Sequence, residues 1–445
     1  MAKILAFRGI TYNTKQVNPS LVLTQPYDKI NDELQRKYYK RHPYNLVRIT
    51  KGKEKKGDNN QNNKYTRARQ FLNKWLDEQI LVQDKEPAIY AYYQEYRVDN
   101  QLKVRKGFIA LARLEDFGKG GVHAHERTLL KPKQDRLSMM RAVGGSTGQV
   151  FMLYADPQLL VNKLLDQTIK GKKPDLQAKD DYGEIHKLWK VTAPAVINKI
   201  AQLFTNKALF IADGHHRYET AINYRNEMRG QGLTCAGNES YENRMMTFVN
   251  MDDAGLTILP THRLIFGLPK FWPYDLLKAL APYFDITEYL FSTTAEEKQA
   301  RKQFLTDLKN QGKKHHAFGL VTHLPKYCLL TLKDESLMDT VIKEKQSPAW
   351  KRLDVTILHS LILDKLLGIS KEKVAREENV EYRRHTDEVF EALKKKRYQM
   401  GFLLNPTKAH EVKDIAAKGE RMPQKSTDFY PKLLSGIVIS KIAYI

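Results

Sequence analysis

The chain has 445 residues, enough for one large or two ordinary domains with a sizeable apolar core. Hydrophobic residues make up 42% of it, and no apolar run approaches the ~18 residues that span a bilayer, so we expect no membrane-spanning segment. Lysine and arginine outnumber aspartate and glutamate by 74 to 51, a formal charge of +23 that suits an anionic substrate or a nucleic acid.

The basic residues are not arranged as in a nucleic-acid-binding protein. Basic runs such as 51–56 and 394–397 are short and scattered, and there is no zinc-finger, RNP or clear helix-turn-helix pattern. Cys235 and Cys328 lack metal-ligand spacing and predict neither a disulfide framework nor a structural zinc site. The apolar stretch within residues 1–8 is too short for a signal peptide, so we expect a cytoplasmic protein.

Strand and helix patterns alternate over the first 113 residues, which predicts a mixed α/β fold. We expect helices at 32–40 and 65–78, and strands in four stretches of alternating or continuous apolar character: 4–8, 43–49, 88–97 and 107–113. An extended run at 21–26 ends at Pro26 and presents Asp28 just beyond its end, where side chains often face a site.

A second polar cluster follows at 123–136. In an extended chain His123 and His125 share one face, a spacing that metals use. Such a density of charged side chains is more typical of an ion-pair network or a phosphate-binding wall. We therefore expect no tightly bound metal here and take His125, Glu126 and Arg127 as candidate site residues.

The most informative stretch is 208–221. An apolar run at 208–212 breaks at Asp213-Gly214 and resumes at helical spacing, which predicts a strand, a tight turn and a helix. The unpaired N–H groups and the dipole of a helix N-terminus attract phosphate or carboxylate, and His215, His216 and Arg217 lie in the same turn. The alternative makes Asp213 a helix cap and its neighbours surface residues, but four adjacent functional residue types favour a ligand-binding or catalytic role.

The C-terminal half contains two further motifs. An extended segment at 256–263 ends with His262 and Arg263 directly after a Pro-Thr pair, and we take both as candidate phosphate- or substrate-binding residues. The run 419–427 resembles a P-loop but has proline and glutamine at 423 and 424, so we reject that motif while keeping Lys425, Ser426 and Thr427 as phosphate ligands. We expect a catalytic core at 1–267, a supporting subdomain of helices and a β-hairpin at 268–345, and a segment at 346–445 that packs back on the core.

Several short motifs resemble, in combination, a widespread prokaryotic family catalogued as a domain of unknown function. The resemblance covers nearly the whole chain. The motifs are Phe7-Arg8-Gly9, Pro26-Tyr27-Asp28, Pro43-Tyr44-Asn45, His125-Glu126-Arg127-Thr128, Asp213-Gly214-His215-His216-Arg217-Tyr218, Pro260-Thr261-His262-Arg263, Leu353-Asp354-Val355 and Met422-Pro423-Gln424-Lys425-Ser426-Thr427.

The central turn also resembles the D-G-H-x-R turn of the ParB and sulfiredoxin superfamily, whose members bind nucleotide phosphates there and include kinases of free L-serine. This resemblance implies a ParB/sulfiredoxin-like core with a mixed sheet, elaborated by helices. It also implies phosphoryl transfer from ATP, ADP or pyrophosphate, with Mg²⁺, to a small hydroxyl acceptor, free L-serine above all. Carried over by position, the donor phosphates are held by Gly214, His215, His216 and Arg217, and Asp213 lies near the reacting groups.

Phosphoryl transfer needs positive charge around the transferred group and a carboxylate to accept the hydroxyl proton. The charge comes from Arg217, His216, Arg127 and Lys425, and the candidate bases, which the sequence does not rank, are Glu126, Asp28 and Asp213. Two alternatives remain. One is a metal-dependent hydrolase using His123, His125 and either histidine of the turn; the other is a ParB-like nucleotide-dependent nucleic-acid binder, which the charge favours. The oligomeric state is not indicated.

Overall fold

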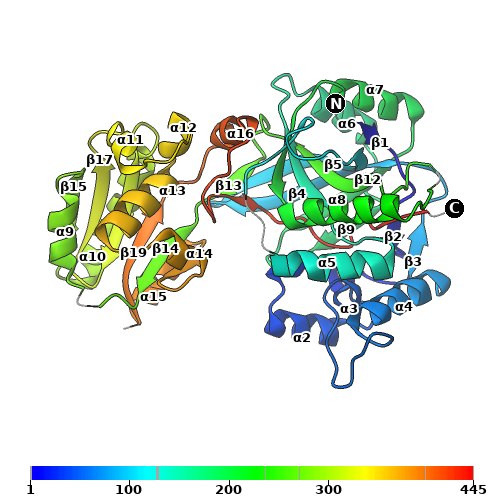
Figure 1. Cartoon of the computed structure of the whole chain (residues 1–445), viewed down its shortest axis with the longest axis horizontal. Helices are drawn as coiled ribbons and strands as arrows, with labels where there is room; N and C mark the ends of the chain where they lie inside the picture. The colour runs from blue at the N-terminus through cyan, green and yellow to red at the C-terminus, as the bar shows by residue number, and fades with distance from the viewer. Residues whose placement is uncertain (1–2, 127–129, 236, 270, 396, 444–445) are drawn as a thin grey trace. The chain divides into compact units, whose positions relative to one another are not determined.

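The computed structural model describes residues 3–126, 130–235, 237–269, 271–395 and 397–443. The chain forms two units, Met1–Thr257 together with Phe429–Ile445, and Ile258–Asp428 (Figure 1). It passes between them at β13 (Thr257–Leu259) and β20 (Asp428–Tyr430). None of the described helices is long and apolar enough to cross a membrane.

The described part of the first unit is built on a nine-stranded sheet of order β6-β11-β8-β12-β5-β4-β10-β9, with β1 paired to β5. The pairs β11–β6 and β12–β8 are parallel and the others are antiparallel, so the sheet is mixed. The strands are β1 (Ile4–Leu5), β4 (Ile89–Val98), β5 (Gln101–Arg113), β6 (Val122–Ala124), β8 (Val150–Tyr154), β9 (Leu176–Lys179), β10 (Ile185–Val191), β11 (Leu209–Asp213) and β12 (Asn243–Asn250). The expected mixed α/β class is confirmed.

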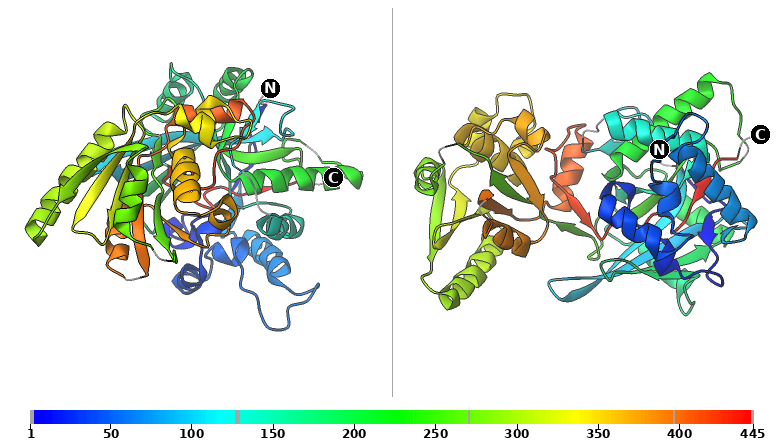
Figure 2. Two further views of the ribbon diagram at one scale, coloured as in Figure 1. Left: turned by 60° about the vertical axis from the view of Figure 1, so that its left-hand side comes forward. Right: turned by 90° about the horizontal axis from the view of Figure 1, so that it is seen from below.

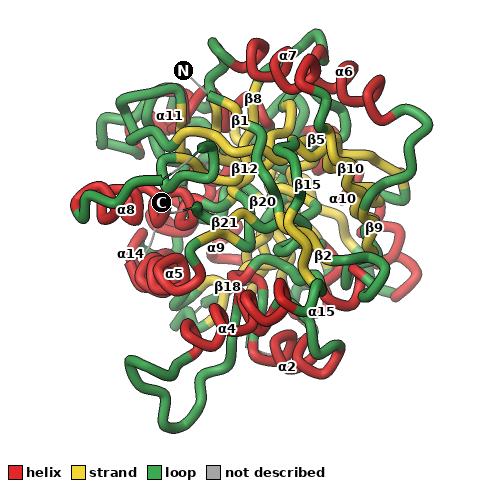
Figure 3. The backbone as a smooth tube through the Cα atoms, turned by 90° about the vertical axis from the view of Figure 1, so that its right-hand side faces the viewer, coloured by secondary structure: helices red, strands yellow, loops and turns green. Residues whose placement is uncertain are grey.

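One face of this sheet carries the apolar core of the first unit. Phe108, Met152 and Phe248 pack there against α6 (Leu160–Ile169), α7 (Pro194–Phe204) and α8 (His215–Gly230). Helices α6 and α7 lie side by side, at the opposite end of the unit from α2 (Asp32–Arg41) and α4 (Lys64–Asp77) (Figure 3). Helix α5 (Leu130–Val143) packs between α4 and α8.

Local sequence explains most elements of the first unit. The long hairpin of β4 and β5 turns at Asp99 and Asn100, whose φ angles of 50° and 61° match the type I′ turn that short polar residues favour. Helix α4 begins at an Asn63–Thr66 capping box and buries Ala68, Leu72 and Trp75 on one stripe. The smaller elements are β2 (Ile10–Tyr12), α1 (Pro19–Val22), η1 (Tyr27–Lys29), α3 (Val47–Thr50), β3 (Leu81–Gln83), β7 (Gly145–Ser146) and β21 (Ser440–Lys441).

Two predicted extended segments are wrong. The segment 43–49 forms helix α3 at its end, because the Asn45 side chain accepts a hydrogen bond from the Val47 N–H at 3.0 Å and starts a helical turn. Before Pro26 the chain forms helix α1, which the Asn18 side chain caps. Apolar residues in turns this short satisfy a strand pattern equally well.

The described part of the second unit contains a six-stranded antiparallel sheet of order β15-β17-β16-β19-β14-β18. The π-helical segment η2 (Leu358–Leu366) packs on one face, while α10 (Thr294–Gln311) and α15 (Thr386–Leu393) pack on the other; Figure 2 shows α10 running along this sheet. The other elements are α9 (Pro273–Leu280), α11 (Leu337–Val341), α12 (Pro348–Lys351), α13 (Asp354–Ile357), α14 (Lys371–Ala375), α16 (Ala409–Ala417), β14 (His262–Phe266), β15 (Phe284–Leu290), β16 (Ala317–Thr322), β17 (Lys326–Leu332), β18 (Val380–Arg383) and β19 (Tyr398–Leu404).

This division of the chain differs from the expected 1–267, 268–345 and 346–445. Strand β14, expected in the core, pairs with β18 and β19, which were expected in the C-terminal segment. The expected supporting subdomain therefore belongs to a larger unit that extends to residue 428, and only Phe429–Ile445 return to the first unit. Strands that pair across more than a hundred residues leave no local signal in the sequence.

Candidate functional site

The predicted strand, turn and helix around Asp213 are confirmed. Strand β11 ends at Asp213, Gly214 has a left-handed φ of 93°, and α8 begins at His215. A Cβ atom at position 214 would lie 3.0 Å from Cζ of Arg217. Glycine is therefore required both by the backbone conformation and by the guanidinium group that lies against it.

The Asp213 carboxylate sits between two cations. It accepts hydrogen bonds from Nζ of Lys432 at 2.9 Å and from Nη2 of Arg217 at 3.2 Å. Burial raises the pKa of Asp213, but the charges of Lys432 and Arg217 outweigh burial and hold the pKa well below its ordinary value. Asp213 is thus a permanent anion and a weak base, suited to orienting the two cations.

His215 connects the turn to the predicted cluster at 123–126. Its buried ring lies edge-on to His125, with ring centres 4.7 Å apart, and its Nε2 accepts a hydrogen bond from the His125 N–H at 3.3 Å. The Nδ1 atom lies 3.6 Å from Oε2 of Glu126. The structure thus brings together two clusters separated by about ninety residues of chain. Arg127, also a predicted site residue, lies outside the described residues.

His216, also in the turn, has an imidazole group whose pKa is shifted. Burial lowers its pKa, and the positive charges of Lys133 and Arg217 act in the same direction against the opposing charges of Glu219 and Asp28. The imidazole is therefore neutral at pH 7. Because the charge of exposed Asp28 acts on His216, the turn and η1 share one electrostatic environment.

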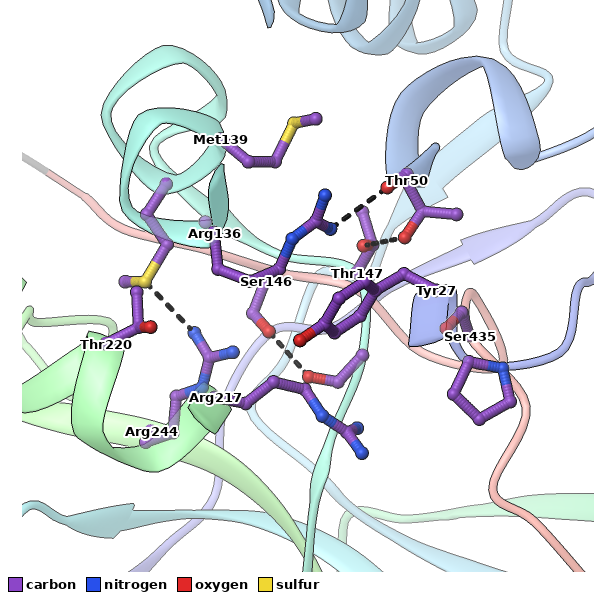
Figure 4. A pocket seen from close by; sticks show the side chains of 14 residues that line it. Tyr27, Thr50, Arg136, Met139, Ser146, Thr147, Arg217, Thr220, Arg244 and Ser435 are labelled. Carbon is purple, nitrogen blue, oxygen red and sulfur yellow. Dashed lines mark hydrogen bonds between the residues drawn. The ribbon is translucent and has the colours of Figure 1, made fainter. Parts of the chain in front are cut away.

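A pocket in the first unit lies against this turn. Its lining includes Arg217 and Thr220 of α8, Arg136 of α5 and Arg244 of β12; Figure 4 shows the three arginine side chains around Tyr27. The remaining lining residues are Pro26, Thr50, Met139, Met140, Gly145, Ser146, Thr147, Gly148 and Ser435. None of the described residues that line the pocket is acidic, so its wall is strongly positive.

The three arginines have different partners. Arg217 donates to the Gln149 carbonyl and to Asp213, and Arg136 donates to Asp135 at 2.5 Å and to the Thr50 carbonyl at 3.0 Å. The Arg136 guanidinium also lies 4.1 Å from the centre of the Tyr27 ring. The environment of Arg244 is unlike that of the other two arginines.

Arg244 has no carboxylate partner within the described part of the chain. Its side chain is buried, Nη1 lies 3.7 Å from Sδ of Met140, and Nε has no hydrogen-bond acceptor among the described residues. Burial lowers the pKa of Arg244 to about 9, and the charge of Arg217 adds to this shift. The group is still charged at pH 7, so an uncompensated cation faces the pocket.

The predicted site residues in the second unit form a cluster of their own. Arg263, fully buried in β14, donates to the Lys425 carbonyl at 3.1 Å and to Nε2 of His359 at 3.3 Å. His262, also buried, accepts a hydrogen bond at Nδ1 from the Leu404 N–H at 3.2 Å. The motifs at 260–263 and 422–427 therefore meet within one unit.

In the loop at 422–427, the predicted phosphate ligand Ser426 forms hydrogen bonds that stabilise the loop. The Ser426 hydroxyl donates to the Pro423 carbonyl at 2.6 Å, and the Thr407 hydroxyl donates to the Ser426 carbonyl at 2.7 Å. Lys425 has a left-handed φ of 58°, and its Nζ lies 5.6 Å from the centre of the Tyr382 ring. Ser426 thus shapes the loop, while the Lys425 side chain packs over an aromatic ring. A role in binding phosphate for Lys425 and Thr427 stays a prediction.

The alternative of a three-histidine metal site gains no geometric support. Among the described residues, no three His, Cys, Asp or Glu side chains come together as a group that could hold a metal ion. His123 is stacked on Phe210, with ring centres 5.2 Å apart.

Sequence reasoning missed Lys432 and Arg244. Lys432 lies 219 residues from Asp213 along the chain and follows no recognisable motif. Arg136 ends the polar cluster predicted at 123–136 but was not among the candidate site residues chosen from it. Arg244 carried a signal of its own, a charge within the strand at 243–250 whose other positions are nearly all buried.

The structure is similar to several solved structures. A mutant free serine kinase in complex with AMP is 11% identical, with a TM-score of 0.33 over 71% of this chain and 89% of that chain. A conserved hypothetical protein from Pyrococcus furiosus is 12% identical, with a TM-score of 0.31 over 73% and 90%. SbnI from Staphylococcus aureus with a C-terminal truncation is 10% identical, with a TM-score of 0.33 over 74% and 85%. Similarity at this level carries no inference about function.

No curated protein matches the chain. The family described as "Protein of unknown function (DUF1015)" matches residues 4–356, which is most of the chain. Seven of the eight motifs quoted from the sequence lie within this region, and the eighth, at 422–427, lies beyond it. The protein therefore belongs to the DUF1015 family.

Proposed function

We propose that this protein is a phosphotransferase that moves a phosphoryl group from ATP, ADP or pyrophosphate to the hydroxyl group of a small metabolite, with free L-serine as the first acceptor to test. The observation that carries the proposal is the Lys432–Asp213–Arg217 arrangement at the N-terminus of α8. Two cations held by one carboxylate leave an excess of positive charge beside the positive end of a helix dipole.

This arrangement suits phosphoryl transfer because the protein's main task in that reaction is to place positive charge before the reaction begins. Asp213 holds the ammonium group of Lys432 and the guanidinium group of Arg217 in fixed positions, so neither has to reorganise around the transferred group. His216, neutral at pH 7, can donate a hydrogen bond to a phosphate oxygen without adding charge.

The proton of the acceptor hydroxyl needs a carboxylate base, and Asp213, whose pKa is held low by two cations, is a poor one. We assign this role to Asp28, an exposed carboxylate whose charge acts on His216 and whose neighbour Tyr27 lines the pocket. Glu126, which lies beside His215, is the competing candidate. Mg²⁺, which the donor would carry on its phosphate oxygens, takes only one or two protein carboxylates, and these two residues fit that need.

The direct test is phosphorus NMR of the purified protein with Mg²⁺ and L-serine, and with ATP, ADP or pyrophosphate in separate tubes. We expect a new phosphomonoester signal with one donor, no such signal when serine is omitted, and loss of the signal in Asp213→Asn. Glu227→Gln is the matched control, because it changes a carboxylate on the same helix whose partner is the exposed Arg141. If the protein is folded and no tube shows a new phosphomonoester signal, serine phosphorylation is contradicted.

A further inference from the structure

The buried charge of Arg244 needs an explanation that the protein's own side chains do not supply. Its side chain is buried apart from the part that lines the pocket, it has no carboxylate partner within the described residues, and its Nε has no acceptor there. Burying an unpaired charge is strongly unfavourable, and native proteins rarely retain one without a ligand or partner. The repulsion by Arg217 makes the position still less favourable.

Of the two neighbouring arginines, Arg217 is only partly neutralised. It shares Asp213 with Lys432, so one carboxylate is divided between two cations. Arg136 shares Asp135 with Lys64, but Lys64 also pairs with Glu54. Together with Arg244 this leaves more than one uncompensated positive charge around the pocket, which favours a dianion over a singly charged group.

The size and polarity of the pocket restrict the ligand further. The cavity has a volume of about 40 Å³, whereas a single water needs about 10–15 Å³, so it takes a small group and not a whole nucleoside. The Thr50, Thr147 and Ser435 side chains add hydroxyl groups to the lining. Guanidinium forks and hydroxyl groups are the donors that bind phosphate oxygens.

We propose that the pocket lined by Arg136, Arg217 and Arg244 binds one phosphate group, either as inorganic phosphate or as the phosphate of a small phosphomonoester. This site goes beyond the proposed phosphoryl transfer at Asp213, since binding needs no turnover. Arg217 belongs to both, so an occupied pocket would fix the arginine that Asp213 holds.

The experiment is isothermal titration of the full chain, free of nucleotide, with inorganic phosphate, glycerol 3-phosphate and acetate in separate runs. The variant is Arg244→Gln, and its matched control is Arg141→Gln, which removes an equal charge from an exposed arginine of α5. We expect phosphate or the phosphomonoester to bind the unmodified protein and the control, and to bind Arg244→Gln at least about tenfold more weakly. The tighter of the two ligands identifies the source of the phosphate group.

Three outcomes overturn the proposal: equal binding of phosphate by Arg244→Gln, equally tight binding of acetate, or no binding of either phosphate compound at millimolar concentration. A second measurement uses only the unmodified protein, so the proposal can still be tested if Arg244→Gln does not fold. Phosphate should shift the ¹H–¹⁵N side-chain Nε resonances of the pocket arginines and leave that of Arg141 in place. Because this readout is independent of catalysis, it also separates failure of the phosphate site from failure of the proposed activity.

Discussion

Nη2 of Arg217 lies 3.2 Å from Oδ1 of Asp213, and the two side chains meet across Gly214 at the start of α8. Through its other terminal nitrogen, Arg217 donates to the Gln149 carbonyl at the edge of the arginine-lined pocket. One guanidinium group thus belongs both to the charged turn and to the pocket.

Replacing Gly214 with alanine should lower the free energy of unfolding by roughly 1–2 kcal/mol, because the left-handed backbone and the nearby guanidinium both oppose a Cβ atom. Gly230→Ala, at the other end of α8, is the control: nothing lies within 4 Å of its added Cβ. Urea unfolding of both variants checks this. Equal effects at the two positions would show that the turn is not strained by a side chain.

The contribution of Asp213 to stability should depend on pH. Its pKa is lowered in the folded state, so its contribution is fully present above the unfolded pKa of about 4 and is lost as the pH falls toward the lower folded value. Asp213→Asn should therefore cost about 2 kcal/mol at pH 7. Urea unfolding of both proteins at several pH values should show this difference shrinking below pH ~4. A difference that grows with acidity would contradict the Lys432–Asp213–Arg217 arrangement.

Replacing Lys432 with alanine should reduce the proposed serine phosphorylation by about 100-fold in kcat, the usual loss when one preorganised positive group is removed. The exposed Lys441, in the same C-terminal segment, supplies the control Lys441→Ala, which should retain full activity. Initial rates with the donor identified by phosphorus NMR measure both variants. Full activity in Lys432→Ala would show that the ammonium group of Lys432 does not contribute to catalysis.

The two candidate bases, Asp28 and Glu126, can be ranked by kinetics. If Asp28 accepts the hydroxyl proton, Asp28→Asn should lower kcat by about 100-fold and leave KM for serine nearly unchanged. Glu126→Gln, beside His215, should have the smaller effect. The opposite order of the two variants in steady-state kinetics would transfer the role of base to Glu126.

Without phosphate, Arg244→Met should be as stable as the unmodified protein or about 1–2 kcal/mol more stable, because an unpaired buried charge is replaced by an apolar side chain. The contrast is Arg225→Met, which removes a buried guanidinium that donates to the Leu114 carbonyl at 3.0 Å and to Asp116 at 2.5 Å, and which should lose about 2 kcal/mol. Thermal unfolding in a phosphate-free buffer measures both. A marked loss of stability in Arg244→Met would indicate a partner for Arg244 within the protein.

The sequence by itself determined the features that depend on neighbouring residues. The apolar run at 208–212, the Asp-Gly break and the helical spacing after it predicted β11, the tight turn and α8, because strand length, turn chemistry and helix periodicity are local properties. The same reasoning predicted the mixed α/β class. It failed at 43–49, where a few apolar residues fit a helical turn as well as a strand.

Only the tertiary structure decided which distant residues meet. Lys432 reaches Asp213 because the last segment of the chain returns to the first unit, and β14 joins β18 and β19 because strand pairing depends on sheet topology rather than on adjacent sequence. Arg136 ends the polar cluster predicted at 123–136, and Arg244 comes from a strand that shows no motif. Their charges become informative only after packing has buried Arg244 and placed both arginines beside Arg217, since electrostatic interactions depend on distance and burial in space.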